Sequence, residues 1–320
     1  MPTSPCLVVR TPGRLTTVQD AGRWGWQHLG VPVGGPMDAL AFRRANRLVG
    51  NDAFAAGLEM TLDGPTVEFV GPATVAIAGA AASAHLNGVR VPAECAFDAP
   101  HGGVLEVGPL SHGARACLAV AGGLETPLVL GSRATTLAVL GGRPLRAGDV
   151  LPIGLRPAGD GRVPGATRQH GARPRMRQPQ GAIVLRVLPG PDVGVGAGDE
   201  RSGEVGTALA SLCEGDYVLD AQSNRMGYRL TGPIVHLGAG GSFSAGTVMG
   251  MVQVPPDGQP ILLMADRQTT GGYPVVGVVI AADLPHAGQL APGDRCRFTL
   301  CTRRDAMAAL LLQERDVLGG

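Results

Sequence analysis

The densest group of chemically capable side chains lies at residues 265–274 (ADRQTTGGYP), between two apolar runs. Asp266 is suited to act as a general base or to orient another group. Three polar residues follow it, Gln268, Thr269 and Thr270, and their amide and hydroxyl groups suit a lactam or urea-like substrate. Gly271 and Gly272, before Tyr273, let backbone N–H groups approach a ligand. The alternative is a hairpin turn whose Thr and Asp side chains bond to their own backbone.

A second polar group lies near the N-terminus, at residues 16–23 (TTVQDAGR). Gln19 offers an amide, and Arg23 can bind a carboxylate or phosphate with two parallel hydrogen bonds while Asp20 fixes its direction. The alternative is a structural turn with an internal Asp–Arg pair, and these residues alone favour that interpretation.

A third polar group occupies residues 223–230 (SNRMGYRL). If this segment is a strand, Asn224 and Met226 face one way while Arg225, Gly227 and Arg229 face the other. Two arginines on one face suit an anionic ligand, although solvated arginines on an edge strand are the commoner outcome. Downstream, Gln253 lies in an apolar strand, where an inward amide is a candidate ligand contact.

The composition excludes several classes of chemistry. All 27 basic residues are Arg, so the chain has no lysine for a Walker A loop, a Schiff base, or covalent biotin or lipoate. The net charge of +1 does not indicate a nucleic-acid partner, and the longest apolar run is far shorter than a membrane span.

The histidines and cysteines carry no recognisable site pattern either. The seven His have no metal-ligand spacing and the six Cys form no Cys-x-x-Cys pair, so we predict no metal site. We expect reduced thiols in a cytoplasmic protein without a secretory signal.

Short runs rich in Val and Ile, separated by Gly, Pro, Asp or Asn, predict an all-β protein with a few short helices. Their spacing favours barrels or sandwiches over alternating strand–helix units. The predicted strands are 7–10, 66–70, 74–78, 104–107, 116–120, 183–188, 234–237, 248–254, 261–264, 275–280 and 296–300.

Two helices are expected. One follows Asp38 as N-cap and ends at Gly50, and the other follows Asp305 near the C-terminus.

The chain divides at an Arg- and Pro-rich stretch, residues 156–180, which lacks aliphatic periodicity and predicts a linker or long loop. We therefore expect one β-barrel-like unit over 1–155 and a second over 181–320. Each part also carries a Gly-Gly, Pro, Leu, Leu, Gly-Asp series, in which the offsets from Pro to the first Leu and from the last Leu to Gly-Asp match, and this suggests two related units.

In their order along the chain, these motifs closely resemble those of the family of the 5-oxoprolinase C subunit, also known as the KipA or allophanate hydrolase subunit 2 family. This family corresponds to the A and B subdomains of the carboxyltransferase domain of urea carboxylase. The matching segments cover nearly the whole chain: TVQD at 17–20 with GR at 22–23, GVP at 30–32, GPMD at 35–38, ANRLVGN at 45–51, LE at 58–59, GP at 64–65, AVAGG at 119–123, SNRMGYRL at 223–230, VQVP at 252–255, GQP at 258–260 and LMADRQTTGGYP at 263–274.

The resemblance implies a cyclophilin-like fold with two β-barrel-like units, and a place in a heteromeric complex. Its partners would be a KipI-like B subunit together with a LamB/YcsF-type A subunit, and the complex would use ATP to hydrolyse 5-oxoproline to glutamate. The substrate-binding residues would include Gln19, Asp20, Arg23, Asn224 and Arg225. Gln253, Gly271, Gly272 and Tyr273 complete this set.

Two other functions fit the same resemblance. One is the carboxyltransferase component of a biotin-dependent urea or amide carboxylase, with biotin on a separate carrier protein. The other is a regulatory binding partner of a KipI-like kinase inhibitor. The chain also departs from the family pattern twice. Ala245 stands at the Glu position of a common Ser-Glu-Gly motif, and Ala134 stands at the second Ser of a common Gly-Ser-x-Ser-Thr motif.

Overall fold

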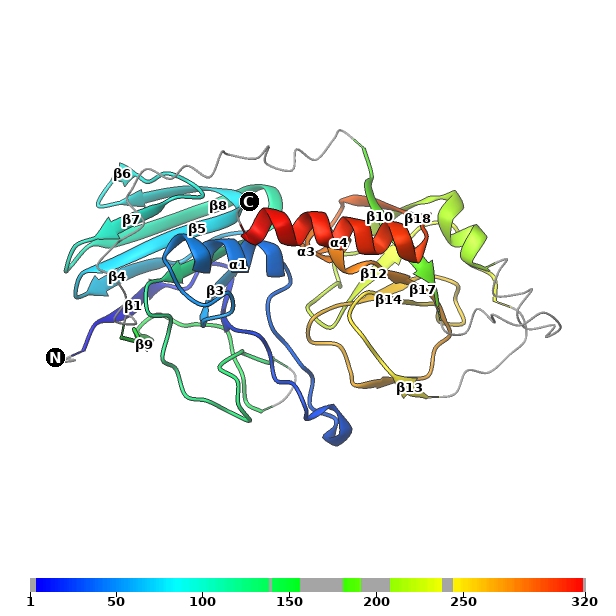
Figure 1. The fold of residues 1–320 in the computed structure, drawn as a ribbon, viewed down its shortest axis with the longest axis horizontal. Coiled ribbons are helices and arrows are strands. Elements are labelled where there is room, and N and C mark those ends of the chain that lie inside the picture. The colour runs from blue at the N-terminus through cyan, green and yellow to red at the C-terminus, as the bar shows by residue number, and fades with distance from the viewer. Residues whose placement is uncertain (1–3, 138–139, 156–180, 191–207, 238–243, 319–320) are drawn as a thin grey trace. The chain divides into compact units, whose positions relative to one another are not determined.

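The computed structural model describes residues 4–137, 140–155, 181–190, 208–237 and 244–318. The chain forms two compact units. Unit 1 comprises Met1–Trp24 and Gly34–Arg177, and unit 2 comprises Gly25–Val33 and Gln178–Gly320. The expected linker at 156–180 lies outside the described residues. Figure 1 shows strands as the main elements of both units, which confirms the all-β prediction.

Unit 1 is built around a nine-stranded sheet, whose path runs β2-β3-β8-β4-β1-β9 while β5 branches from β8 and also pairs with β6 and β7. The elements are β1 (Cys6–Thr11), β2 (Leu15–Gln19), α1 (Ala39–Leu48), β3 (Gly57–Thr61), β4 (Thr66–Val70), β5 (Ala73–Leu86), β6 (Val89–Arg90), β7 (Ala96–Ala99), β8 (Val104–Val120) and β9 (Val150–Pro152). The inner face of the sheet holds the hydrophobic core of this unit, which includes Leu7, Phe69 and Leu118.

Helix α1 covers the outer face of part of this sheet. Phe42 and Ala45 of α1 pack against Ala76 of β5 and Cys117 of β8. Asp38 is the N-cap as predicted, because its side chain accepts a 2.8 Å hydrogen bond from the backbone N–H of Ala41.

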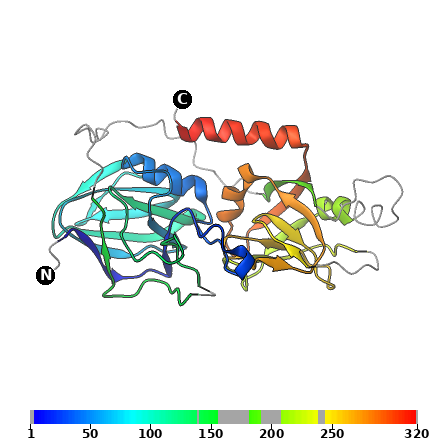
Figure 2. The same cartoon turned by 60° about the horizontal axis from the view of Figure 1, so that its bottom comes forward.

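Unit 2 contains a closed seven-stranded barrel in the order β10-β17-β14-β15-β12-β11-β18, in which β18 returns to β10 as its parallel neighbour (Figures 1 and 2). The barrel strands are β10 (Ile183–Pro189), β11 (Asp216–Leu219), β12 (Gly227–Thr231), β14 (Met251–Gln253), β15 (Ile261–Leu263), β17 (Val275–Val279) and β18 (Arg295–Leu300). A separate two-stranded ladder pairs β13 (Ala245–Gly246) with β16 (Thr270–Gly271). Large buried side chains such as Tyr217, Tyr228 and Phe298 belong to the barrel strands.

The helical elements of unit 2 include η1 (Gln27–Leu29), η2 (Ala281–Asp283), α3 (Leu284–Gly288) and α4 (Arg303–Leu318), and residues 208–214 are helical as well. Figure 2 shows α4 as a helix outside the barrel wall. Asp305 does not cap α4 as expected. Thr302 precedes the helix, and its hydroxyl accepts from the backbone N–H of Asp305 while the Asp305 carboxylate accepts from the Thr302 backbone N–H, which is a capping box.

Two of the predicted strands are confirmed but form one continuous strand, one predicted strand is absent, and one is shorter than predicted. Residues 104–107 and 116–120 belong to the single long strand β8, which pairs with β3, β4 and β5 at different points. Residues 234–237 form no strand, and the segment predicted as 248–254 is extended only at β14. A turn at 249–250 interrupts the apolar run, and Gly250 there has a φ of 95°.

Candidate functional site

The polar motifs of unit 2 meet at a buried ion pair between Arg225 and Asp266. Nε and Nη2 of Arg225 donate to the two carboxylate oxygens of Asp266 at 3.0 and 2.9 Å. The side chains are 4% and 2% exposed, and the Asp266 backbone N–H donates to the Arg225 carbonyl at 2.8 Å. Because both carboxylate oxygens accept from the guanidinium, the two side chains fix each other's orientation.

Arg225 does not lie in a strand, contrary to the conditional expectation for residues 223–230. Strand β12 begins at Gly227, and Asn224 forms a turn in which its Oδ1 accepts from the Met226 backbone N–H at 2.8 Å. Arg225 is therefore buried while Arg229 on β12 is exposed, so the two arginines do not share a face.

Arg267 follows Asp266 and is a third buried charge, which the sequence motifs did not single out. Its side chain is 7% exposed. Nε donates to the carbonyl of Thr247 and Nη1 to that of Met264, both at 3.5 Å. Burial lowers the pKa of the Arg267 guanidinium. The signal was present in the sequence, because Arg267 lies inside the polar motif beside Asp266.

The polar turn after Arg267 is held by Thr247. The Thr247 hydroxyl donates to the carbonyl of Gln268, and its backbone N–H donates to the carbonyl of Thr269 at 3.0 Å. Thr270 and Gly271 then form strand β16, whose partner is β13. The turn is thereby fixed through its backbone, and the exposed Thr270 is not needed for that purpose.

Gln253 and Gly271 approach each other closely. Gln253 is buried as expected, and its Nε2 donates to the carbonyl of Tyr273 at 3.5 Å. A Cβ on Gly271 would lie 2.5 Å from that same nitrogen, closer than real contacts permit. Glycine at 271 thus makes room for the amide of Gln253. Gly272 and the Tyr273 ring are exposed beside this contact.

The polar motif of unit 1 anchors a loop at residues 129–136, which we call the anchored loop. Oδ1 of Asp20 accepts from the Ser132 hydroxyl at 2.6 Å and from the Gly22 backbone N–H at 2.9 Å. Oδ2 accepts from the backbone N–H of Arg133 at 2.6 Å. Asp20 therefore has a clear structural task in holding this loop.

Arg23 binds the anchored loop as well. The residue is 3% exposed, and its guanidinium donates to the carbonyls of Val129 at 2.7 Å and Ala134 at 2.7 Å, and to the Thr136 hydroxyl at 2.8 Å. These bonds favour a structural role for Arg23, although it is exercised through the anchored loop and not through the expected pair with Asp20. Gln19 donates from Nε2 to Thr17 at 2.9 Å, while its buried Oε1 has no partner among the described residues.

The two departures from the family pattern lie next to these groups. Ala245 on β13 pairs directly with Gly271 on β16. Ala134 is buried in the anchored loop, where its carbonyl accepts from Arg23. Each alanine thus lies beside predicted site residues.

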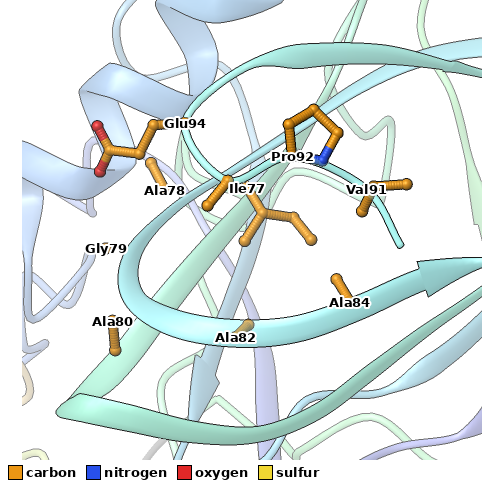
Figure 3. Close-up of a pocket in the computed structure, with 10 residues that line it drawn as sticks. Ile77, Ala78, Gly79, Ala80, Ala82, Ala84, Val91, Pro92 and Glu94 are labelled. Atoms are coloured by element: carbon orange, nitrogen blue, oxygen red, sulfur yellow. The ribbon is translucent and has the colours of Figure 1, made fainter. Parts of the chain in front are cut away.

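A small depression on unit 1 is lined by Ile77 and small residues of β5, together with Val91, Pro92 and Glu94 (Figure 3). It contains none of the predicted site residues.

Within the described ranges, no group of three or more His, Cys, Asp or Glu side chains is placed to hold a metal ion. No helix in the same ranges is long and apolar enough to cross a membrane.

Comparison with known proteins identifies the class. Residues 29–300 match the family model described as carboxyltransferase domain, subdomain A and B, and the chain belongs to this family. It is 39% identical to the 5-oxoprolinase C subunit of Escherichia coli strain K12 over 308 residues, which cover 95% of this chain and 94% of that protein. The resemblance found in the sequence is thereby confirmed.

The chain is also similar to one part of much larger proteins. It is 34% identical to urea amidolyase of Lachancea kluyveri over 92% of this chain but only 17% of that protein. The crystal structure of Kluyveromyces lactis urea carboxylase superposes with a TM-score of 0.81 and 27% identity, over 99% of this chain and 29% of that one.

Proposed function

We propose that this chain is the C subunit of a heteromeric, ATP-dependent 5-oxoprolinase. The observation that carries the proposal is the match along nearly the full length of both this chain and the 5-oxoprolinase C subunit. The urea enzymes match over only a minor part of their own length. The partners would be a KipI-like B subunit together with a LamB/YcsF-type A subunit, and the chain would be inactive without them.

The reaction opens a five-membered lactam. Water adds to the amide carbon, the C–N bond breaks, and glutamate forms with a free amine and a second carboxylate. ATP, bound in the complex, transfers a phosphoryl group to the lactam oxygen and leaves as ADP. Ring opening then leaves this phosphoryl group on the new carboxyl group, and a second water hydrolyses the acyl phosphate to the carboxylate and inorganic phosphate. Such activation needs donors directed at the lactam oxygen and a fixed substrate position.

The residues of unit 2 suit the positioning part of this task. Asp266, held by Arg225, would orient the reacting groups, and Gln268, Thr269 and Thr270 would bond to the amide. The backbone N–H groups of Gly271 and Gly272, in the turn fixed by Thr247, would polarise the lactam oxygen. The amide of Gln253 and the Tyr273 ring lie beside that turn.

In unit 1, Gln19 carries a buried acceptor without a partner among the described residues, and it remains a proposed substrate contact. Asp20 and Arg23 would act through the anchored loop, by holding it in place.

The direct test is ATP hydrolysis by the full chain mixed with its A-type and B-type partner proteins, with and without 5-oxoproline. We expect ADP and glutamate in equal amounts only when all three proteins are present. No turnover in a complex shown to be assembled would refute the proposal.

A substitution tests Asp266 in the same assay. Asp266→Asn should lower kcat by about 100-fold or more, as expected for a group that positions or moves a proton. Asp257→Asn is the matched control, because Asp257 is exposed in a turn of the same unit. Unchanged turnover in Asp266→Asn would disprove the role of Asp266.

Carboxyl transfer to urea or another amide is the second candidate, favoured by the family model and by the urea carboxylase structure. The chain has no lysine, so biotin would have to arrive on a separate carrier protein. Capture of a biotinylated partner together with urea-dependent carboxylation, and no glutamate formation, would select this function.

We also place the complex in the cytoplasm. All six cysteines are free in the structure, and free thiols are typical of a reducing compartment. Fractionation of cells producing the tagged chain would test this assignment.

A further inference from the structure

The three charged side chains at 225, 266 and 267 are all buried, and their charges do not cancel. Arg225 and Asp266 neutralise each other through two hydrogen bonds. Arg267 has no carboxylate partner among the described residues, and its two acceptors are backbone carbonyls. The group therefore carries a net charge of +1 in a region shielded from water.

Such a charge is costly to bury. A guanidinium stays protonated in proteins, so Arg267 cannot become neutral to escape the cost. Its two hydrogen bonds are 3.5 Å long, beyond the usual N–H···O range of about 2.7–3.2 Å. They therefore compensate for little of the hydration free energy that the guanidinium loses on burial. An anion bound to Arg267 would supply the missing compensation.

Arg23 shows what a structurally satisfied buried arginine looks like in this protein. It is buried to a similar degree, yet it donates to carbonyl and hydroxyl oxygens of the anchored loop at 2.7–2.8 Å. Arg23 and Arg267 therefore differ in the number and length of their hydrogen bonds rather than in how deeply they are buried. Arg267 therefore has bonding capacity that the described part of the chain does not use.

The groups that follow Arg267 in the chain are neutral, and the carboxylate of Asp266 before it is engaged by Arg225. The neutral groups are the side chains and backbone of residues 268–272, with the amide of Gln253 close to Gly271. One cation followed by neutral donors matches a small ligand that has a single negative charge and an amide. 5-Oxoproline has one carboxylate and one lactam.

We propose that Arg267 binds the carboxylate of the amide substrate and so sets the specificity of the site for a carboxylated lactam. The identity of the lactam rests on the proposed function. The sequence had suggested Arg23 and Arg225 as the residues that bind an anion. In the structure, however, Arg23 donates to backbone carbonyls and Arg225 donates to Asp266.

The test compares 5-oxoproline with 2-pyrrolidinone, the same lactam without the carboxylate. In the assembled complex, Arg267→Met should raise KM for 5-oxoproline about 10- to 150-fold, the range for one lost charge-assisted hydrogen bond, and change kcat much less. The preference for 5-oxoproline over 2-pyrrolidinone should fall by the same factor. Arg267→Lys should restore part of it, because the positive charge returns.

The control is Arg229→Met, which removes an exposed arginine from β12 of the same barrel and should leave the preference unchanged. Thermal unfolding shows whether each variant is folded. If Arg267→Met does not fold, Arg267→Lys and Arg267→Gln take its place. A folded Arg267 variant without positive charge that keeps the preference for 5-oxoproline would overturn the proposal.

Calorimetric binding to the full chain alone separates this proposal from the proposed function. If the wild-type complex makes no glutamate, the proposed function fails. The Arg267 site still stands if the full chain binds 5-oxoproline, but not 2-pyrrolidinone, in an Arg267-dependent way. Arg267-dependent binding of inorganic phosphate or bicarbonate without binding of 5-oxoproline would overturn the carboxylate assignment.

Discussion

Removing one member of the Arg225–Asp266 pair should destabilise unit 2 far more than removing both. The two side chains are 4% and 2% exposed, so neither charge can be hydrated if its partner is lost. The backbone bond between Asp266 and Arg225 remains in every variant, which keeps the two segments together. The variants are Arg225→Met, Asp266→Leu and the double replacement.

The expected magnitudes follow from burial. Breaking a buried pair by removing one partner costs about 3–5 kcal/mol, whereas a well-packed apolar replacement of both partners is often neutral. Asp266→Leu should lie at the upper end, because it removes the carboxylate that holds the buried Arg225 guanidinium through two hydrogen bonds. The double variant should come within about 2 kcal/mol of the wild type, so the two changes are strongly non-additive.

Hydrogen exchange measured by mass spectrometry can follow unit 2 separately from unit 1. Peptides from β12 and β15 should exchange about 100-fold faster or more in each single variant, since about 1.4 kcal/mol corresponds to a factor of ten. Peptides from β3 and β8 in unit 1 are the internal reference and should not change.

A second ion pair in the same barrel provides the control. Arg297 donates to Asp216 at 2.6 Å, but its side chain is 50% exposed. Arg297→Met should therefore cost no more than about 1 kcal/mol. The reasoning would be refuted if the Arg225 and Asp266 variants cost no more than this control, or if the double variant cost the sum of the two single variants.

Three further predictions concern other parts of the protein. Gly271→Ala should lower kcat/KM of the assembled complex about 10- to 100-fold by displacing the Gln253 amide, whereas Gly246→Ala on the paired strand, with nothing within 4 Å, should not. Asp20→Asn should destabilise the anchored loop by about 1–3 kcal/mol, visible as faster hydrogen exchange in that loop but not in β3. Burial raises the pKa of Cys296 from 9.0 to about 12, so the unfolded chain loses this proton first and stability should fall above pH 9, by about 1.4 kcal/mol per pH unit. Urea midpoints at pH 9 and 10.5 would measure the fall, and Cys296→Ala should reduce it; an equal fall in that variant would contradict the assignment.

The sequence predicted the fold class and most apolar strands because buried β-strands concentrate Val and Ile. It missed β2 and β3, whose polar residues Gln19 and Glu59 are buried on the outer face of the sheet. Both faces of these strands are covered, so the alternation of apolar and polar residues that marks a half-exposed strand is lost.

The sequence located the polar motifs, but it could not predict which of their arginines would be paired with a carboxylate. Arg225 and its carboxylate are 41 positions apart, and the oxygens that engage Arg23 come from more than 100 positions away. Which arginine is neutralised depends on contacts made only after folding. Residue type and local spacing contain no information about those contacts.

This dependence on folding changes how the arginines of the motifs are interpreted. Before folding, Arg23, Arg225 and Arg267 are equivalent, because each is a guanidinium in a polar segment. In the folded protein Arg23 bonds to a loop and Arg225 to a carboxylate, while Arg267 has, among the described residues, two long bonds to backbone carbonyls. A substrate anion gains most where a buried charge is least compensated, since binding there replaces solvation that folding has already removed. The arginine with the poorest internal partners is therefore the best candidate to recognise the substrate.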